Sequence, residues 1–253
     1  MKVAVINYSG SVGKTLISSY LLAPRLTGAK FYAVETINQS ASDLGIENVT
    51  SFKGDDFSRL IEDIVFEDAG IIDIGASNVE AFLMAMSRFD SGANEFDKYV
   101  IPVTPDNKAI DESLKTAHTL SKAGVSSKKI IFVPNRISPD SEVEDVLAPV
   151  FEFVKETKIG KISKKAVIYN SEVFEYLAFH RISFEVLTAE DPEEFKSRAK
   201  QTTDADERKK LARRYTYMKQ AIPVKANLDK AYAALMNKME KQPDKLEVLM
   251  DWF

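Results

Sequence analysis

The segment Ser9-Gly10-Ser11-Val12-Gly13-Lys14-Thr15 directly follows an apolar run, Val3–Ile6, and carries the residues best suited to chemistry. A buried strand that enters a glycine-bearing turn and then a helix presents backbone N–H groups, and the positive end of the helix, to a polyphosphate. We expect Lys14 to reach the β- and γ-phosphates and the Thr15 hydroxyl to ligate Mg²⁺. The segment therefore predicts a nucleotide-binding loop whose contacts extend to Leu16. Tyr8 departs from the strict pattern G-x-x-x-x-G-K-[ST], which has glycine at that position.

Acidic residues follow two other apolar runs. Asp73 ends one of them, and a carboxylate there can hold the waters of a loop-bound Mg²⁺ or cap a helix, while Gly75 lets the backbone approach the γ-phosphate. Glu35 follows another run, either as part of the same site or as a solvated turn residue. We interpret Lys14, Glu35 and Asp73 as catalytic residues. The predicted magnesium ligands are Thr15, Asp73 through water, and Glu35.

Two later segments offer contacts for a base. Asn135-Arg136 follows the apolar run 130–134, where the asparagine could read a purine edge or cap a turn. Tyr169 could cover the face of an adenine, or pack as an ordinary strand-end tyrosine. No N-K-x-D guanine motif is present at Asn135, so the sequence favours ATP over GTP.

The order of the elements predicts an α/β fold. Nearly continuous apolar runs are typical of strands buried on both faces, and they alternate with segments of helical period. We therefore expect a doubly wound, mainly parallel sheet of about seven strands, with ligands at the carboxyl ends of the strands. The expected strands are 2–7, 31–35, 70–74, 99–103, 130–134, 166–169 and, more weakly, 182–187. The expected helices are 14–25, 55–65, 78–89, 108–123, 142–156 and 171–179.

A helical extension follows this pattern. Residues 192–200 and 206–220 have helical period, and Pro223 is expected to open a third helix that reaches about Gln242. We divide the chain into a nucleotide-binding domain, 1–200, and a C-terminal extension, 201–253, packed on the same domain.

Composition excludes several classes of protein. The chain has 253 residues, 45% of them hydrophobic, and no cysteine, so disulfides, thiol nucleophiles and thiolate zinc sites are excluded. His118 and His180 lack metal-ligand spacing. No signal peptide and no run of about 20 apolar residues is present, which predicts a cytoplasmic protein without a membrane span.

The net charge of −4 is unevenly distributed. Residues 207–245 hold eleven Lys/Arg and four Asp/Glu, a balance of +7, which leaves −11 for the rest of the chain. This segment is either a solvated helix face or a contact for non-specific DNA, and in the second case the protein would associate with the nucleoid. The residues proposed for DNA are Arg208, Lys209, Lys210, Arg213 and Arg214. The tail 246–253 is apolar with two acids, which favours docking on the protein itself or on a partner over a membrane helix.

The chain resembles the ParA/MinD-type ATPases with a deviant phosphate loop. Their loop, K-G-G-V-G-K-[ST], matches at Gly10 and at Val12–Thr15. Their D-x-D-P-Q element falls on Glu35, Ile37, Asn38 and Gln39, their strand-end aspartate on Asp73, their V-L-I-P-V strand on 99–103, and their Asn-Arg adenine contact on Asn135-Arg136. The resemblance spans about residues 1–190, and within the family the StbB-like plasmid stability proteins are most similar.

Two departures bear on hydrolysis. The signature lysine of the family, which reaches across an ATP-sandwich dimer, is Ser9 here, and the D-x-D-P-Q acids fall on Glu35 and Ile37. A cation supplied in trans can contribute about 10³-fold or more to phosphoryl transfer. The resemblance therefore implies slow or partner-dependent ATP hydrolysis, with ATP/ADP and Mg²⁺ as cofactors.

Three functions stay open. The first is an ATP-binding switch in plasmid partition, stability or positioning, which would form a homodimer on ATP and engage a plasmid-encoded DNA-binding adaptor. The second is a nucleotide-binding scaffold that does not hydrolyse ATP. The third is a small-molecule kinase or ATP-dependent ligase on the same fold, for which the sequence offers no evident acceptor pocket.

Overall fold

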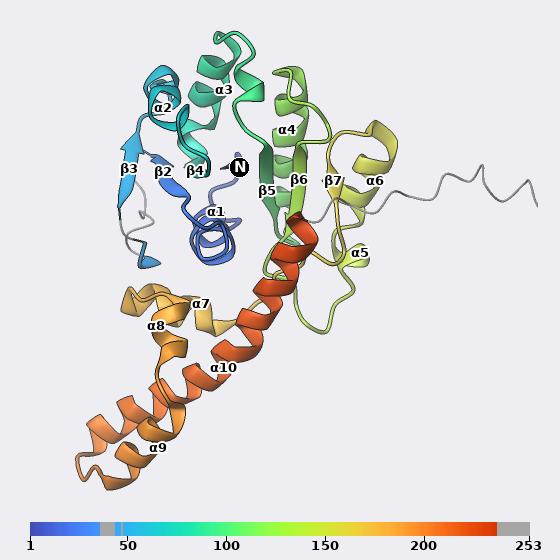
Figure 1. The fold of residues 1–253 in the computed structure, drawn as a ribbon. Coiled ribbons are helices and arrows are strands. Elements are labelled where there is room, and N and C mark those ends of the chain that lie inside the picture. The colour runs from blue at the N-terminus through green and yellow to red at the C-terminus, as the bar shows by residue number, and fades with distance from the viewer. Residues whose placement is uncertain (36–43, 47, 237–253) are drawn as a thin grey trace, which may run out of the picture.

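The computed structural model describes residues 1–35, 44–46 and 48–236 (Figure 1). Its centre is a seven-stranded sheet with strand order β3-β2-β4-β1-β5-β6-β7. All pairings between neighbouring strands are parallel. The strands are β1 Lys2–Val5, β2 Lys30–Val34, β3 Val49–Phe52, β4 Gly70–Ile74, β5 Lys98–Val103, β6 Ile130–Pro134 and β7 Lys161–Ile162. The predicted α/β class and parallel sheet are confirmed.

Helices connect the strands and continue after them. A single turn, α1 (Lys14–Leu16), leads into a π-helix, η1 (Ile17–Leu22), and two 3₁₀ turns lie at η3 (Ala76–Asn78) and η4 (Gly92–Asn94). The remaining helices are α2 Phe57–Ile64, α3 Val79–Ser87, α4 Asn107–Lys122, α5 Val143–Val146, α6 Ala148–Thr157, α7 Glu172–His180, α8 Phe184–Ala189, α9 Pro192–Gln201 and α10 Ala205–Met236.

The two faces of the sheet have separate hydrophobic clusters, which is the doubly wound arrangement. Side chains alternate along each strand, so Ala4 packs under the cluster of α2, α3, α4 and α6, whereas Val3 and Val5 pack under η1, α7, α8 and α10. Leu228 of α10 belongs to the second cluster. The division of the chain at residue 200 stays a prediction.

Two expected strands need correction, and one strand was not predicted. Residues 182–187 lie largely in α8, whose N-terminus is capped by Ser183, because its side chain accepts from the Val186 amide. The segment 166–169 makes only an isolated bridge, Ile137 to Tyr169, and β7 pairs with β6 instead. The unpredicted strand is β3, whose Val-Thr-Ser-Phe sequence exposes two polar residues and lacks a continuous apolar run.

The expected break at Pro223 is wrong. One helix, α10, runs continuously from Ala205 to Met236 with Pro223 inside it. Pro223 lies on the exposed side of the helix, where water can replace the hydrogen bond that its missing N–H would have made. The α9 helix and the first half of α10 form a hairpin that extends away from the sheet (Figure 1). Among the described residues no helix is both long and apolar enough to cross a bilayer.

Candidate functional site

The loop between β1 and α1 adopts the geometry expected of a phosphate-binding turn. Gly13 lies in the left-handed region at φ 81° and ψ 40°, directly before α1, and its carbonyl accepts from the Ile17 amide at 3.0 Å. A Cβ atom at Gly13 would lie 2.5 Å from the Asn135 side-chain nitrogen. Both the backbone conformation and this close contact therefore require glycine.

Lys14 is buried within the turn. Its Nζ donates to the carbonyls of Asn7 at 3.1 Å and Ser9 at 2.6 Å. Burial lowers the pKa of Lys14, while the negative charges of Asp73, Glu35 and Glu112 act in the opposite direction. The ammonium group thus lies in the loop, close to Asp73 near the end of β4 and to Glu35 directly after β2.

Those two acidic residues come together because β2 and β4 are adjacent. Ala33 pairs with Asp73, so Glu35 and Asp73 meet at the carboxyl edge of the sheet. Burial raises the pKa of Asp73 to about 6. The Thr15 hydroxyl, the Lys14 charge and the Ser18 hydroxyl act in the opposite direction and lower this pKa. Burial, together with the charge of Asp73, raises the pKa of Glu35 to about 7, and Lys14 opposes this shift.

The donor set at this edge fits Mg²⁺. Within the described part of the chain, Asp73 Oδ1 is buried without a hydrogen-bond partner, which is costly unless a cation or a proton compensates the charge. Thr15 and Glu35 add oxygen donors beside it, and oxygen is the ligand that Mg²⁺ prefers. No group of three or more acidic or histidine side chains among the described residues could hold a metal ion alone. Water and phosphate oxygens would therefore have to complete the coordination.

Gly75 allows Glu35 to lie across the end of β4. The Gly75 amide donates to the Val34 carbonyl at 2.9 Å. A Cβ atom at Gly75 would lie 2.7 Å from Glu35 Cγ and 3.2 Å from the Val34 carbonyl oxygen. Because Gly75 has no side chain, it leaves the space that the Glu35 side chain occupies.

The Asn7 side chain connects the loop to the sheet and to α4, a role that was not predicted from the sequence. Its amide nitrogen donates to the Pro102 carbonyl at 2.7 Å and to Ser113 Oγ at 2.8 Å, and its Oδ1 accepts from the Ser9 amide at 2.8 Å. The residue is fully buried. One side chain therefore joins the loop to β5 and α4, and only the fold brings those partners together.

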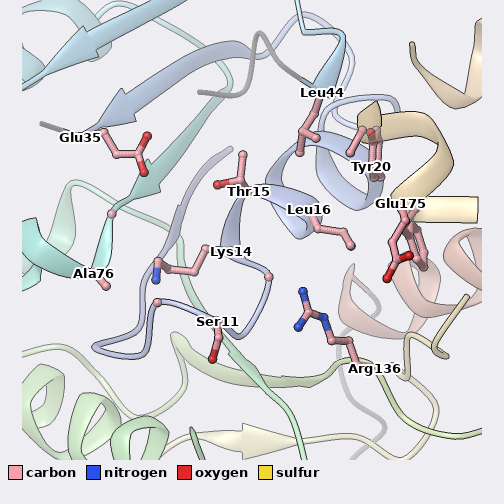
Figure 2. Close-up of a pocket in the computed structure, with 15 residues that line it drawn as sticks. Ser11, Lys14, Thr15, Leu16, Tyr20, Glu35, Leu44, Ala76, Arg136 and Glu175 are labelled. Atoms are coloured by element: carbon pink, nitrogen blue, oxygen red, sulfur yellow. The ribbon is translucent and has the colours of Figure 1, made fainter. Parts of the chain in front are cut away.

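A cavity of about 490 Å³ lies over the loop (Figure 2). Lys14, Thr15 and Glu35 occupy one side of it in Figure 2. The other side is mainly apolar and includes parts of α7, with Glu175 and Arg136 as its polar groups. Its lining residues there are Leu16, Tyr20, Leu44, Phe174 and Ala178. The cavity thus combines a polar end at the loop with an apolar end that the sequence analysis missed.

The residues proposed for the base lie in different places. Arg136 lines the cavity and has a left-handed backbone at φ 56°. Asn135 is buried, and its side-chain amide donates to the Val12 carbonyl at 2.8 Å, so it braces the loop. Tyr169 lines a separate cavity against α10. Contact of Asn135 or Tyr169 with a base stays a prediction.

The remaining loop residues differ in how far they are exposed to solvent. Gly10 and Ser11 line the cavity, whereas Val12 is fully buried. Ser9 is also buried, with 4% of its surface exposed, and its carbonyl accepts from Lys14. Ile37, Asn38 and Gln39 lie outside the described residues, as does the tail 246–253.

The basic segment lies on the hairpin of α9 and α10. Arg208, Lys209, Lys210 and Arg213 are exposed, whereas Arg214 is partly buried and pairs with Glu190 at 2.8 Å. A second cavity, of about 420 Å³, lies in the hairpin between the two helices, with Lys196 and Lys200 of α9 beside Arg208. The structure therefore adds two lysines of α9 to the predicted basic surface.

Several solved structures have a fold similar to that of this chain. MinD from Aquifex aeolicus aligns at a TM-score of 0.53 and 17% identity, over 72% of this chain and 86% of that one. The Pyrococcus furiosus cell division ATPase MinD aligns at 0.52 and 14% identity, over 88% and 98%. McdA from Cyanothece, without nucleotide, aligns at 0.50 and 15% identity, over 87% and 98%. The chain has the fold of MinD and McdA.

The MinD/McdA fold agrees with the resemblance found in the loop. No protein-family model and no curated protein sequence matches the chain. At identities of 14–17% the comparison supports similarity of fold only. The roles of individual residues are therefore inferred from the geometry of the site.

Proposed function

We propose that the protein is an ATP-dependent switch of the ParA/MinD type that dimerises on ATP·Mg²⁺ and hydrolyses it slowly. The observation that carries this proposal is the buried Asp73 Oδ1, which lacks a partner within the described part of the chain. It lies at the strand edge shared by Lys14, Thr15 and Glu35, beside a cavity of about 490 Å³. A bound Mg²⁺ would supply charge neutralisation at the β- and γ-phosphates.

The chain's own residues have separate tasks in this proposal. The backbone of Gly10–Gly13 and the Lys14 ammonium bind the phosphates, and the apolar end of the cavity holds the base. Thr15, Asp73 and Glu35 hold Mg²⁺, directly or through water. Where Glu35 does not ligate the ion directly, its carboxylate at the polar end of the cavity can instead accept a proton from an attacking water.

Slow hydrolysis is proposed because of Ser9. A serine side chain carries no charge, and this residue is buried in the loop. It therefore supplies no cation to the phosphates of a second subunit. Turnover would depend on a cation supplied by a protein partner such as an adaptor.

The decisive test is sedimentation of the wild type and of Lys14→Ala, each with and without ATP·Mg²⁺. The wild type should double in mass with ATP·Mg²⁺, and Lys14→Ala should remain monomeric. Lys122→Ala, which changes an exposed lysine at the end of α4, is the matched control and should behave like the wild type. A mass that ATP leaves unchanged in all three proteins would refute the switch.

A nucleotide-binding scaffold is the second candidate, and the buried Ser9 favours it specifically. Phosphate release measured with ATP·Mg²⁺, duplex DNA and a plasmid-encoded adaptor separates the two. No turnover under any of these conditions, with dimerisation retained, would support the scaffold.

The finer role in plasmid partition, stability or positioning follows from the resemblance to StbB-like proteins. DNA contact would use the exposed cations Arg208, Lys209 and Arg213 of the hairpin. Each phosphate contact that is lost should reduce the slope of log K against log salt by about 1. Reversal of these three charges should flatten the salt dependence of DNA binding, measured by anisotropy, whereas Lys122→Glu should not.

A further inference from the structure

A cavity of about 760 Å³ on α10 lies outside the site described above. One of its walls carries Lys164, Lys165 and Tyr169, and the other carries Lys230, Ala233 and Ala234 of α10. Asn227 ties the two walls together, because its Nδ2 donates to the Val167 carbonyl at 2.9 Å and its Oδ1 accepts from the Tyr169 amide at 3.2 Å. The groove is therefore a fixed feature of the fold.

The lining of this groove combines positive charge with an exposed aromatic ring. Lys164 pairs with Glu144 at 3.2 Å, but Lys165 and Lys230 have no ion-pair partner among the described residues. Tyr169 is 40% exposed. It shares the cavity with alanines of α10, whose small side chains leave space for an occupant. A fitting occupant carries acidic groups together with large apolar side chains.

We propose that the C-terminal segment 246–253 of the same chain docks in this groove. Its sequence, Leu-Glu-Val-Leu-Met-Asp-Trp-Phe, holds two acids, no base and six apolar residues. The two acids complement Lys165 and Lys230, and the apolar side chains cover Tyr169 and the alanines.

The connection is long enough for this docking. The last described residue of α10, Met236, comes two positions after Ala234, which lines the groove. Residues 237–245 can span up to about 30 Å when extended. The groove face of α10 from Ala226 to Ala234 is only about 12 Å long. A tethered segment also has a high effective concentration, on the order of millimolar, so a modest intrinsic affinity is sufficient.

Trp252 provides a direct test, because it is the single tryptophan of the chain. In the full-length protein we expect blue-shifted tryptophan emission and iodide quenching several-fold below that of a peptide covering 237–253. The double charge reversal Lys165→Glu with Lys230→Glu should shift the emission to the red and restore quenching to the level of the peptide. The matched control is Lys122→Glu with Lys128→Glu, which makes the same change of charge at exposed positions near the end of α4 and should leave both signals unchanged.

Each other outcome overturns the proposal. Peptide-like emission in the wild type means that the tail is undocked, and a blue shift that survives the groove variant means that it docks elsewhere. A blue shift that grows with protein concentration between 0.1 and 10 µM (about the range in which weak dimers form) assigns the tail to a second copy. Far-UV circular dichroism of all variants checks that they are folded, and nucleotide is absent throughout, so the result is independent of the proposed ATP switch.

Discussion

Arg25 Nε donates to Asp229 Oδ1 at 2.8 Å and so connects the turn after η1 to α10. The same guanidinium donates through Nη1 to the carbonyls of Tyr20 at 2.7 Å and Leu21 at 3.1 Å. The Tyr232 hydroxyl of α10 donates to the Arg25 carbonyl at 3.1 Å. The helix behind the phosphate loop and the helix with the basic segment therefore share one charged contact.

Asp229→Ala should lower the free energy of unfolding by about 1–2 kcal/mol, because a charge-assisted hydrogen bond to a largely buried guanidinium is lost. Arg25→Ala should cost more, since the carbonyls of Tyr20 and Leu21 also lose their donor. Urea unfolding measures both changes. Lys225→Ala removes only the exposed 3.4 Å contact to Asp229 and should cost less than about 0.5 kcal/mol. Equal effects of Asp229→Ala and Lys225→Ala would show that the Arg25 contact adds no stability.

Asn135→Ala should separate loop support from base recognition. Its amide donates to the Val12 carbonyl at 2.8 Å, so the substitution leaves a buried acceptor unpaired and should cost about 1–3 kcal/mol. If Asn135 only braces the loop, the affinities for ATP and for inorganic tripolyphosphate should fall by the same factor, measured by calorimetry. A loss confined to ATP would instead establish contact with the base. Ser138→Ala, a nearby exposed change, is the control.

Gly13→Ala should be far more damaging than Gly10→Ala. At Gly13 the φ of 81° and the 2.5 Å approach of Asn135 both oppose a Cβ atom. We expect a loss of about 1–3 kcal/mol in stability from such strain, together with loss of tripolyphosphate binding. A Cβ atom at Gly10 meets nothing within 4 Å, so Gly10→Ala should leave the unfolding free energy unchanged within about 0.5 kcal/mol. Similar unfolding curves for the two variants would contradict this account of the loop.

The sequence predicted the polar end of the site because that end depends on strand ends alone. Lys14 and Glu35 follow buried runs and Asp73 lies at the end of one, and parallel strands bring such positions to one edge. The apolar end could not be predicted, because Phe174 and Ala178 reach the cavity through the placement of α7 over η1. The strand predicted at 182–187 from its β-rich composition is also wrong. A capping serine and tertiary packing favour a helix there.

The two raised carboxyl pKa values, about 6 for Asp73 and about 7 for Glu35, predict a dependence of stability on pH. Between about pH 4 and 7 the folded protein without nucleotide holds these protons more tightly than the unfolded chain, so its stability should fall as pH rises. Asp73 alone should account for a fall on the order of 2–3 kcal/mol. Urea unfolding at about pH 4 and about pH 8 measures the fall, which Asp73→Asn should reduce and Asp140→Asn, at an exposed position, should not.

Binding of Mg²⁺ with nucleotide should have the opposite dependence on pH, because the cation and the proton compete for the same carboxyl groups. The additional affinity that Mg²⁺ gives to ATP should therefore rise from about pH 5 to about pH 8, a range that extends about one unit below and above the two pKa values and in which Asp73 and Glu35 lose their protons. Calorimetry with ATP, with and without Mg²⁺, isolates this term. An affinity gain from Mg²⁺ that is independent of pH would place the cation away from Asp73 and Glu35.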